Sequence, residues 1–295
     1  MEFTRLSNCP LCSSENISTY KKGTINPVKV NKEDFRITDS TYGSVWDFSS
    51  CSFCSFVFSN PMIDEKSLIG FYTELEDKEY SEEWEGREKN FRTIIKRLNK
   101  MPKPGNKLLD IGAASGIFVK LAEENEYSAE GIEPSSQLAR EAKERFGVNI
   151  IEGTIDDYDA KTQFDIVSLL DLIEHVNDPS DFIRRVSPHV RKGGILVIVT
   201  PDIKSIPARI FKNKWWHYRT AHVNFFSLES LTYLMEKYGF VIEKKHRYAW
   251  NFSLFYIVSR LFPSVKKRKG LQLLLKRLNL RLQLFDSWEI YARKS

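Results

Sequence analysis

From residue 105 onward the chain alternates apolar runs with stretches of helical pattern. One apolar run ends at Asp110 and is followed by a turn that contains Gly112 and Gly116, and then by a helical stretch, Phe118–Glu126. Ile195–Thr200 is an unbroken run of β-branched and aliphatic residues, which is typical of a strand buried on both faces of a parallel sheet. The alternation predicts an α/β fold built from units of strand, turn and helix.

A later helix has recognisable ends. Ser227 is suited to be its N-cap, with Ser230 three residues further along, and Gly239 is suited to end it. The sequence therefore predicts a helix between residues 227 and 239.

The glycine-containing turn predicts a ligand. Gly112 and Gly116 carry no Cβ, so the backbone can approach a bound molecule closely. Glu133 lies 21 positions beyond Gly112, at the end of the next strand, where it can accept hydrogen bonds from a ribose diol. The pattern Asp-x-Gly-x-x-x-Gly lacks the middle glycine that a pyrophosphate requires. A nucleoside without phosphates therefore fits better than a dinucleotide.

In this order, these segments resemble the class I S-adenosylmethionine-dependent methyltransferases over about residues 105–245. The segment Phe164–Val176 is similar to the fourth strand of that family and the turn after it. The resemblance implies a Rossmann-like sheet of seven mostly parallel strands, with an antiparallel last strand near Trp288. It assigns residues 105–295 to the methyltransferase domain.

The resemblance also implies where S-adenosylmethionine binds. The glycine-containing turn and Glu133 are expected to hold the nucleoside, and residues near Thr154 are expected to contact the adenine. The implied cofactor-binding residues are Asp110, Gly112, Ala113, Gly116, Glu133, Asp156 and Asp171.

His175 is the main catalytic candidate, and three interpretations of it stay open. It can be a general base, because an imidazole titrates near neutral pH and can remove a proton from an acceptor hydroxyl. It can bind a divalent cation with Asp171 and Glu174, which resembles the Glu-x-x-Glu-His metal set of ubiquinone-pathway O-methyltransferases and small-RNA 2′-O-methyltransferases; His222 could complete that set. It can also be a structural histidine that is hydrogen-bonded to the backbone. The predicted catalytic residues are His175, Glu174 and His222.

An aromatic and basic loop, residues 215–222, follows the fifth strand. Its flat rings with polar tips suit a pyranose face or an aromatic acceptor, and they suit a hydrophobic plug equally well. His189 and His246 are expected to be structural or solvated.

All four cysteines occur in two Cys-x-x-Cys pairs near the N-terminus: Cys9, Cys12, Cys51 and Cys54. Four thiolates form the closed tetrahedral set that a structural Zn²⁺ prefers. The pattern predicts a zinc ribbon over residues 1–61, with strands at Asn26–Val30 and Val45–Phe48. Two disulfides or four buried thiols are the alternatives, and a cytosolic setting argues against the disulfides.

Residues 62–104 are highly charged and predict a helical connector. Its aromatic residues, from Phe71 to Tyr80, can cover a cofactor as a lid or pack within the connector. Pro102, Pro104 and Gly105 mark its end.

A segment near the C-terminus, residues 249–285, interrupts a predicted hairpin of strands at Val241–Arg247 and Trp288–Arg293. A helical face is predicted from its leucines: Leu271, Leu274, Leu275, Leu278 and Leu282. Residues 260–281 contain eight basic and no acidic residues. A basic amphipathic helix of this kind can lie on an anionic membrane through residues 252–282, or it can pack on the protein or on a second copy.

Bulk properties narrow the function only slightly. The chain has 295 residues, 42% of them hydrophobic, and a net charge of +5, and it has no apolar run of transmembrane length and no secretory signal. We therefore expect a cytoplasmic protein that reaches the inner membrane face at most peripherally.

The predicted function is O-methylation of a small acceptor, with a sugar or glycan intermediate favoured by similarity to bacterial glycan-modifying enzymes. A quinone or lipid acceptor, an RNA 2′-hydroxyl and a non-catalytic S-adenosylmethionine-binding module are the alternatives. Nucleic acid is the less favoured partner, because Asp171–His175 lacks the Asn/Asp-Pro-Pro-Tyr sequence of base-amino methylation. The sequence does not indicate an oligomeric state.

Overall fold

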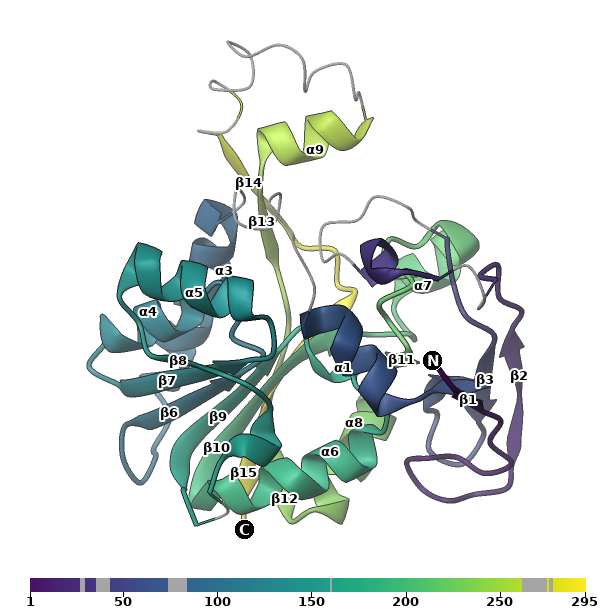
Figure 1. The fold of residues 1–295 in the computed structure, drawn as a ribbon, viewed down its shortest axis with the longest axis horizontal. Helices are drawn as coiled ribbons and strands as arrows, with labels where there is room; N and C mark the ends of the chain where they lie inside the picture. The colour runs from purple at the N-terminus through teal and green to yellow at the C-terminus, as the bar shows by residue number, and fades with distance from the viewer. Residues whose placement is uncertain (27–29, 36–42, 74–83, 160, 262–274, 276–277) are drawn as a thin grey trace.

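The centre of the protein is a seven-stranded sheet in the order β12-β15-β10-β9-β6-β7-β8 (Figure 1). The computed structural model describes residues 1–26, 30–35, 43–73, 84–159, 161–261, 275 and 278–295. The strands of this sheet are β6 (Lys107–Ile111), β7 (Ser128–Glu133), β8 (Ile150–Glu152), β9 (Phe164–Leu170), β10 (Val190–Pro201), β12 (Phe240–Arg247) and β15 (Ser287–Lys294). β15 runs antiparallel to both of its neighbours, and the other neighbouring strands pair in parallel. The predicted Rossmann-like sheet with an antiparallel last strand is confirmed.

Helices cover both faces of this sheet (Figure 1). Successive residues of a strand point to opposite faces, so Leu108 packs under α3 (Trp84–Leu98) and α4 (Ile117–Glu123), whereas Leu109 packs under α6 and α8. The remaining α-helices are α1 (Glu65–Thr73), α5 (Ser136–Phe146), α6 (Pro179–Val186), α7 (Ile206–Phe211), α8 (Leu228–Lys237) and α9 (Leu254–Leu261). Short 3₁₀ turns are η2 (Lys32–Phe35), η3 (Ile155–Asp157), η4 (Ile173–His175), η5 (Ser187–His189) and η6 (Lys212–Lys214).

The predicted capped helix is α8. The Ser227 hydroxyl accepts a hydrogen bond from the Ser230 amide at 3.2 Å, and the Ser230 hydroxyl accepts one from the Ser227 amide at 2.8 Å. The two serines satisfy each other's amides in the same reciprocal way as a capping box.

The N-terminal unit forms a second sheet, in the order β11-β4-β3-β2. Its strands are β2 (Ile17–Lys21), β3 (Phe48–Cys51), β4 (Val57–Ser59) and β11 (Asn224–Phe225), and a separate short pair joins β1 (Phe3–Thr4) to β5 (Met62–Ile63). The predicted strand at Val45–Phe48 is wrong, because β3 starts only at Phe48. Val45 lies in an irregular segment before β3, where its carbonyl accepts hydrogen bonds from the Thr24 and Ile25 amides. The other predicted strand, Asn26–Val30, is not a strand at its two ends, and residues 27–29 lie outside the described part.

The outer strand of this second sheet comes from the other end of the chain. β11 pairs antiparallel with β4, with Asn224 opposite Phe58 and Phe225 opposite Val57. Directly after β11, the ring of Phe226 packs against Phe56, with the ring centroids 5.0 Å apart. The N-terminal unit and the large sheet therefore share one hydrophobic core.

The connector contains β5, α1 and α3, in partial agreement with the predicted helical segment. Phe71 of α1 stacks on Phe35 at a centroid distance of 4.6 Å, whereas the neighbouring Tyr72 lines a cavity described below. Tyr80, the last of the predicted lid aromatics, lies outside the described residues.

The segment near the C-terminus differs from the predicted leucine helix. β13 (Trp250–Ser253) pairs with β14 (Asn279–Leu282) in a two-stranded ribbon, and α9 follows β13 directly. The prediction of a helix through Leu278 and Leu282 is wrong, because the leucines from 278 to 284 alternate with polar residues at the period of a strand. Leu271 and Leu274 lie outside the described residues. Within the described part of the chain, no helix has the length and apolarity needed to cross a bilayer.

The shared core gives a test of the fold. We expect Phe226→Ala to lower the free energy of unfolding by about 3–5 kcal/mol, because it removes a fully buried ring from the junction of the two sheets. Urea denaturation followed by circular dichroism measures this change.

Val241→Ala, at an exposed position of β12, is the matched control and is expected to change stability by less than about 0.5 kcal/mol. Equal stabilities of the two variants would contradict a shared core at Phe226.

Candidate active site

A cavity of about 590 Å³ lies at the edge of the large sheet where β6, β7 and β9 end. Gly112 follows β6, Glu133 ends β7 and Asp171 follows β9, and all three line the cavity. The carboxyl ends of parallel strands meet at one edge of a sheet, which is where open α/β sheets bind their ligands. Helices α1, α3 and α9, the β13–β14 ribbon and the loop that contains His217 contribute further lining residues.

The glycine-containing turn is held against β7. The amides of Gly112 and Ala113 donate to the Ile132 carbonyl at 2.9 and 3.1 Å. Gly112 has a φ of +73°, and a Cβ added there would lie 3.0 Å from Leu172. A larger residue would therefore be strained at this position and would clash beside the cavity.

Glu133 faces this turn. Its carboxylate accepts hydrogen bonds from the Ala114 amide at 2.8 Å and from the Ser135 amide at 2.9 Å. Burial raises the pKa of Glu133 to about 7, although the two amides act in the opposite direction. The carboxylate that the sequence predicts to bind a ribose thus lies at the edge of the cavity, beside the glycine-containing turn.

Four of the residues predicted to bind the cofactor are not part of the cavity lining formed by the described residues: Asp110, Ala113, Gly116 and Asp156. Asp110 lies beneath the turn and accepts a hydrogen bond from the Ser168 hydroxyl at 2.6 Å. Burial raises the pKa of Asp110 to about 7. This hydrogen bond ties Asp110 to β9, so its role is structural.

Gly116 and Ala113 serve packing between helices and sheet. A Cβ on Gly116 would lie 2.8 Å from side-chain carbons of both Ala142 and Val148, and a Cβ on Gly131 would lie 2.6 Å from that of Ala113. Gly116 thus allows the close contact of α4 with the neighbouring helix and strand, away from the ligand.

Asp156, the residue predicted to contact the adenine, lies one or two positions along the chain from the residues that line the cavity. The Asp156 carboxylate forms an ion pair with Arg185 and does not line the cavity, whereas Thr154 and Ile155 do. The 3₁₀ turn η3 points the side chain of Asp156 outward, because successive residues of a tight helix point in different directions.

Asp171 starts the turn after β9 in a left-handed backbone conformation, with a φ of +54°. Its amide donates to the Val199 carbonyl at 3.0 Å, which anchors the turn to β10. Burial raises the pKa of Asp171 to about 7; Arg87 opposes this shift and Asp286 adds to it. Arg87 projects from α3 and lines the same cavity. The cavity lining therefore contains both an acidic and a basic side chain.

The three predicted catalytic residues come together in this cavity. One ligand atom each of Glu174, His175 and His222 lies within 4.8 Å of the other two. The Glu174 carboxylate accepts a hydrogen bond from the Thr200 hydroxyl at 2.9 Å, and burial raises its pKa well above the usual value. Asp171 is not a member of this cluster, so the structure groups His222, rather than Asp171, with Glu174 and His175.

The two histidines differ in their partners. Nδ1 of His175 lies 2.7 Å from the Tyr72 hydroxyl and 2.9 Å from the Ala221 carbonyl. Nδ1 of His222 is buried and has no hydrogen-bond partner. Burial lowers the pKa of His175 to about 4 and that of His222 well below its usual value. Both imidazoles are therefore neutral at physiological pH, the state in which a ring nitrogen can bind a metal.

A backbone hydrogen bond holds the cluster together. The Val223 amide donates to the Glu174 carbonyl at 3.0 Å, and the imidazole centroids of His175 and His222 are 4.7 Å apart. One buried carboxylate and two neutral imidazoles fit the donor set of a divalent transition metal or Zn²⁺.

Sequence reasoning missed several residues of the cavity. His217 forms a hydrogen bond from Nε2 to the Asp286 carboxylate, at 3.1 Å, and Asp286 is fully buried. The sequence drew attention to the loop that contains His217, but nothing in it marks Asp286 or pairs Tyr72 with His175. Arg87 is one of three arginines in the predicted connector, and nothing in the sequence distinguishes it from Arg92 and Arg97.

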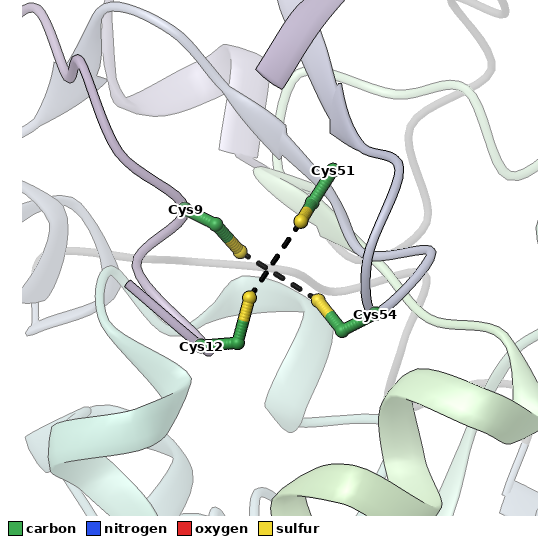
Figure 2. A group of neighbouring side chains, drawn as sticks. All are labelled: Cys9, Cys12, Cys51 and Cys54. Atoms are coloured by element: carbon green, nitrogen blue, oxygen red, sulfur yellow. Dashed lines mark hydrogen bonds between the residues drawn. The ribbon is translucent and has the colours of Figure 1, made fainter. Parts of the chain in front are cut away.

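The four cysteines converge at the other end of the shared core, as Figure 2 shows. The Sγ atoms of Cys9 and Cys54 are 3.6 Å apart, and so are those of Cys12 and Cys51. A tetrahedral zinc with Zn–S bonds of about 2.3 Å places its sulfurs about 3.8 Å apart, so the cluster fits this ion. All four thiols are free, which excludes the predicted disulfide alternative for this structure.

The cysteine cluster is fixed to the helices of the large sheet. The Lys237 ammonium donates to the Leu11 carbonyl, between the first two cysteines, at 2.9 Å, and to the Ser180 hydroxyl at 2.8 Å. This contact connects the first cysteine pair to both α8 and α6.

Comparison with known families gives a match to the core of the chain. A family model described as "Methyltransferase domain" matches residues 84–245, which is more than half of the chain. The match covers the glycine-containing turn, Glu133 and the cluster of Glu174, His175 and His222.

Curated relatives are similar over a shorter stretch. The ubiquinone biosynthesis O-methyltransferase of Bradyrhizobium sp. (strain ORS 278) is 27% identical over 117 residues, which cover 38% of this chain and 46% of that protein. The protein of the same name from Azorhizobium caulinodans is 30% identical over 105 residues, which cover 34% and 42%. The chain thus matches these relatives over less than half of their length.

Solved structures share the fold. Magnesium protoporphyrin IX methyltransferase from Synechocystis PCC 6803, with bound SAH, has a TM-score of 0.54 and 12% identity, covering 79% of this chain and 100% of that chain. A SAM-dependent methyltransferase from Archaeoglobus fulgidus has a TM-score of 0.51 and 18% identity, covering 74% and 100%. At such identities the similarity concerns the fold alone.

The position of Glu133 gives a test of the nucleoside site. We expect Glu133→Gln to weaken the binding of S-adenosylhomocysteine by roughly tenfold to hundredfold, because it removes a charged acceptor. The wild-type affinity is expected to be full above pH 7 and to fall below it, because the ionised carboxylate accepts from a diol more strongly than the protonated acid and burial raises its pKa to about 7.

Isothermal titration calorimetry measures both effects. Glu152→Gln is the matched control, since Glu152 is the register partner of Glu133 on β8 and is exposed. An affinity lost equally in the two variants would exclude the ribose assignment.

Proposed function

The chain belongs to the methyltransferase-domain family, as its sequence predicted, and on that premise we propose that it is an S-adenosylmethionine-dependent O-methyltransferase. The observation that carries this proposal is the convergence of Glu174, His175 and His222 in the same cavity as Gly112 and Glu133. A buried metal-ligand set beside a nucleoside turn supports transfer to an oxygen atom, because an oxygen acceptor needs its proton removed and a cation assists that step.

S-adenosylmethionine supplies the methyl group as a sulfonium, which needs no further activation. In the transfer, the S–CH₃ bond breaks, an O–CH₃ bond forms, and the acceptor hydroxyl loses one proton. The protein's task is therefore to align the two molecules and exclude water. We assign the ribose diol to Glu133 and the methionine carboxylate to Arg87, which lines the cavity from α3. The half-buried Asp171 and the buried Glu174 line the same cavity and would lie near the positively charged half of the methyl donor.

A divalent cation at Glu174, His175 and His222 would lower the pKa of an acceptor hydroxyl bound next to it. The ring of His175 is held by Tyr72 and Ala221 through Nδ1, which directs its Nε2 to the opposite side of the ring. The unpartnered Nδ1 of His222 supports the same role, because a buried polar atom without a partner is costly unless something binds it. We therefore propose that His175 is a metal ligand and not the general base.

The proton acceptor that we propose instead is His217. Its Nε2 donates to the Asp286 carboxylate at 3.1 Å, so the other ring nitrogen, Nδ1, is left with its lone pair. His217 lines the cavity, and its ring stacks near that of His222 at a centroid distance of 5.9 Å. A carboxylate that orients an imidazole and stabilises its protonated form is a common arrangement for a general base.

The lining of the cavity supports an acceptor with an apolar body. Towards the ribbon and α9 the wall is mainly apolar. It includes Phe252, Tyr256, Ile257, Leu282 and Leu284, together with Trp250 and the polar Asn251. An aromatic or lipid-like hydroxyl compound buries its apolar part there, whereas a sugar would leave most of this wall uncovered. We therefore favour the predicted quinone or lipid alternative over the predicted sugar or glycan acceptor.

A sugar acceptor is retained as the second candidate because of one observation. The indole rings of Trp216 and Trp250 line the cavity near His217, and such flat faces also pack against pyranose rings.

The proposed cation site predicts that losing a metal ligand lowers turnover but leaves nucleoside binding nearly unchanged. We expect His222→Ala to abolish binding of Mn²⁺ and to lower methyl transfer at least about a hundredfold, while the affinity for S-adenosylhomocysteine changes less than about threefold, because His222 does not belong to the nucleoside turn. Electron paramagnetic resonance measures the free Mn²⁺, and calorimetry measures the nucleoside.

Transfer is measured with [methyl-³H]S-adenosylmethionine and two probe acceptors, a catechol with an alkyl chain and a nucleotide sugar. His246→Ala, on β12 outside the cavity, is the control. Methylation of the sugar alone would replace the favoured acceptor by the second candidate. Nucleoside binding without transfer to either probe and without Mn²⁺ binding would support the non-catalytic alternative.

We also propose that the four cysteines hold one structural zinc ion. The sulfur geometry fits a closed tetrahedral site, and a closed site has no position for a substrate, so its role is to stabilise the N-terminal unit. The unit is small and has few strands, which supports a need for metal in its folding.

The purified chain is expected to contain one zinc per molecule by plasma mass spectrometry. Cys54→Ser is expected to lose the metal and several kcal/mol of stability, because the remaining thiolates no longer close the site. Ser52→Ala, an exposed neighbour in the same knuckle, is the control. A metal-free wild type of unchanged stability would refute the zinc assignment.

A further inference from the structure

Helix α7 presents large apolar side chains to solvent. Ile206 is 67% exposed, Ile210 is 67% exposed and Phe211 is 47% exposed, although α7 is anchored to the core by the buried Ala208. Ile206 and Ile210 are four residues apart and therefore lie on one side of the helix. A cluster of three such residues on one short element marks a surface that meets another partner.

The same surface is positively charged. Residues 203–222 contain five basic and no acidic residues. Lys204 is paired with Glu229, and the other four include Arg209, Lys212 and Lys214, which are all exposed. We name the exposed set the α7 face; it consists of Ile206, Arg209, Ile210, Phe211, Lys212 and Lys214.

The α7 face adjoins the cavity. The ring of Phe211 lies 5.4 Å from that of Trp216, and both Trp216 and Lys214 line the cavity. On the other side of the cavity, the segment around β14 exposes Leu278, Leu280 and Phe285, while its neighbours Leu282 and Leu284 line the interior. Figure 1 shows α7 and the ribbon with α9 in the upper half of the molecule.

We propose that the α7 face docks the protein on an anionic lipid surface. Ile206, Ile210 and Phe211 enter the boundary between headgroups and acyl chains, and the adjacent Arg209, Lys212 and Lys214 contact lipid phosphates. Apolar insertion combined with cationic contacts is the pattern by which short amphipathic elements bind membranes.

Charge decides between a membrane and a second copy of the chain. In a symmetric dimer through this face, the three cations of one copy would lie near the same cations of the other. Like charges in such an interface are unfavourable, whereas an anionic bilayer satisfies all three. The membrane is therefore the occupant that the α7 face fits.

Docking in this position deepens the proposed function in one respect. The cavity then opens close to the bilayer, so an acceptor with an apolar body reaches it without crossing water. This consequence rests on the proposed acceptor, but the docking itself does not, and the test below involves no methyl transfer.

The test is co-sedimentation of the full chain with vesicles of phosphatidylglycerol and phosphatidylcholine in equal parts, compared with phosphatidylcholine alone. We expect binding to the mixed vesicles, and we expect high salt to weaken it. Ile210→Glu is expected to lower the partition coefficient about tenfold or more, and Arg209→Gln and Lys212→Gln about fivefold each.

Val241→Glu is the matched control, since it introduces the same charge at another exposed apolar position, on β12. It is expected to bind vesicles like the wild type. Affinity for S-adenosylhomocysteine, measured on each sample, shows that all variants are folded.

Three results would overturn the proposal. The first is a wild type that does not sediment with the anionic vesicles, and the second is equal loss of binding in Ile210→Glu and Val241→Glu. The third is a dimer, seen by light scattering without vesicles, that Ile210→Glu converts to a monomer. A chain that binds vesicles but neither Mn²⁺ nor an acceptor would keep the docking inference and refute the proposed function alone.

Discussion

The two-residue strand β11 is the constraint on which the arrangement of the whole molecule depends. On one side it completes the sheet of the N-terminal unit by pairing with β4, and the Val223 carbonyl next to it accepts from the Ser59 amide at 2.8 Å. On the other side, the Val223 amide donates to the Glu174 carbonyl in the turn after β9. His222 lies directly before this junction. The N-terminal unit and the large sheet thus position His222 jointly, and neither unit alone provides the cluster with Glu174 and His175.

The second constraint is electrostatic. Four carboxyl groups, those of Asp110, Glu133, Asp171 and Glu174, are buried at one edge of the sheet, and burial raises the pKa of each. Arg87 opposes this shift at Asp171. Removing charge from water is costly without a partner, and each proton bound at these sites reduces that cost. A sulfonium, an ammonium and a divalent cation bring the missing positive charge. The negative charge of these carboxyl groups would therefore be best compensated when the proposed methyl donor and cation are both bound.

Most of the sheet could be predicted from the sequence, because apolar runs of strand length and capped helices are local patterns. The ribbon near the C-terminus could not, since Leu278 and Leu282 satisfy the periods of both a helix and a strand. Pairing with β13 decides between them, and that partner lies about thirty residues away in the chain. The predicted strand at Val45 failed for a related reason: Val45 and Trp46 are apolar because an irregular segment packs them into a hydrophobic cluster, and not because they alternate across a sheet.

The candidate site, too, could be predicted from the sequence only in part. Glu133 and Gly112 follow from spacing within one strand, turn and helix unit, which is why a local pattern revealed them. The partners of the histidines are distant in the chain: Tyr72 reaches His175 from 103 positions away, and Asp286 reaches His217 from 69. Such pairs depend on how α1 and β15 pack, which periodicity does not encode. The structure places His222, and not Asp171, beside Glu174 and His175. This too depends on a distant contact, because β11 brings His222 to the sheet edge.

The cavity has two chemically different ends. Its charged floor lies at the carboxyl ends of the strands, and its apolar wall is formed by the ribbon and α9, which were inserted between the last two strands of the sheet. An acceptor that places a hydroxyl at Glu174, His175 and His222 must therefore extend its remaining atoms towards Tyr256 and Leu284. A wholly polar acceptor loses water there without regaining hydrogen bonds, whereas an apolar one gains by burial. On the proposed function, the wall that covers the site would also select the acceptor.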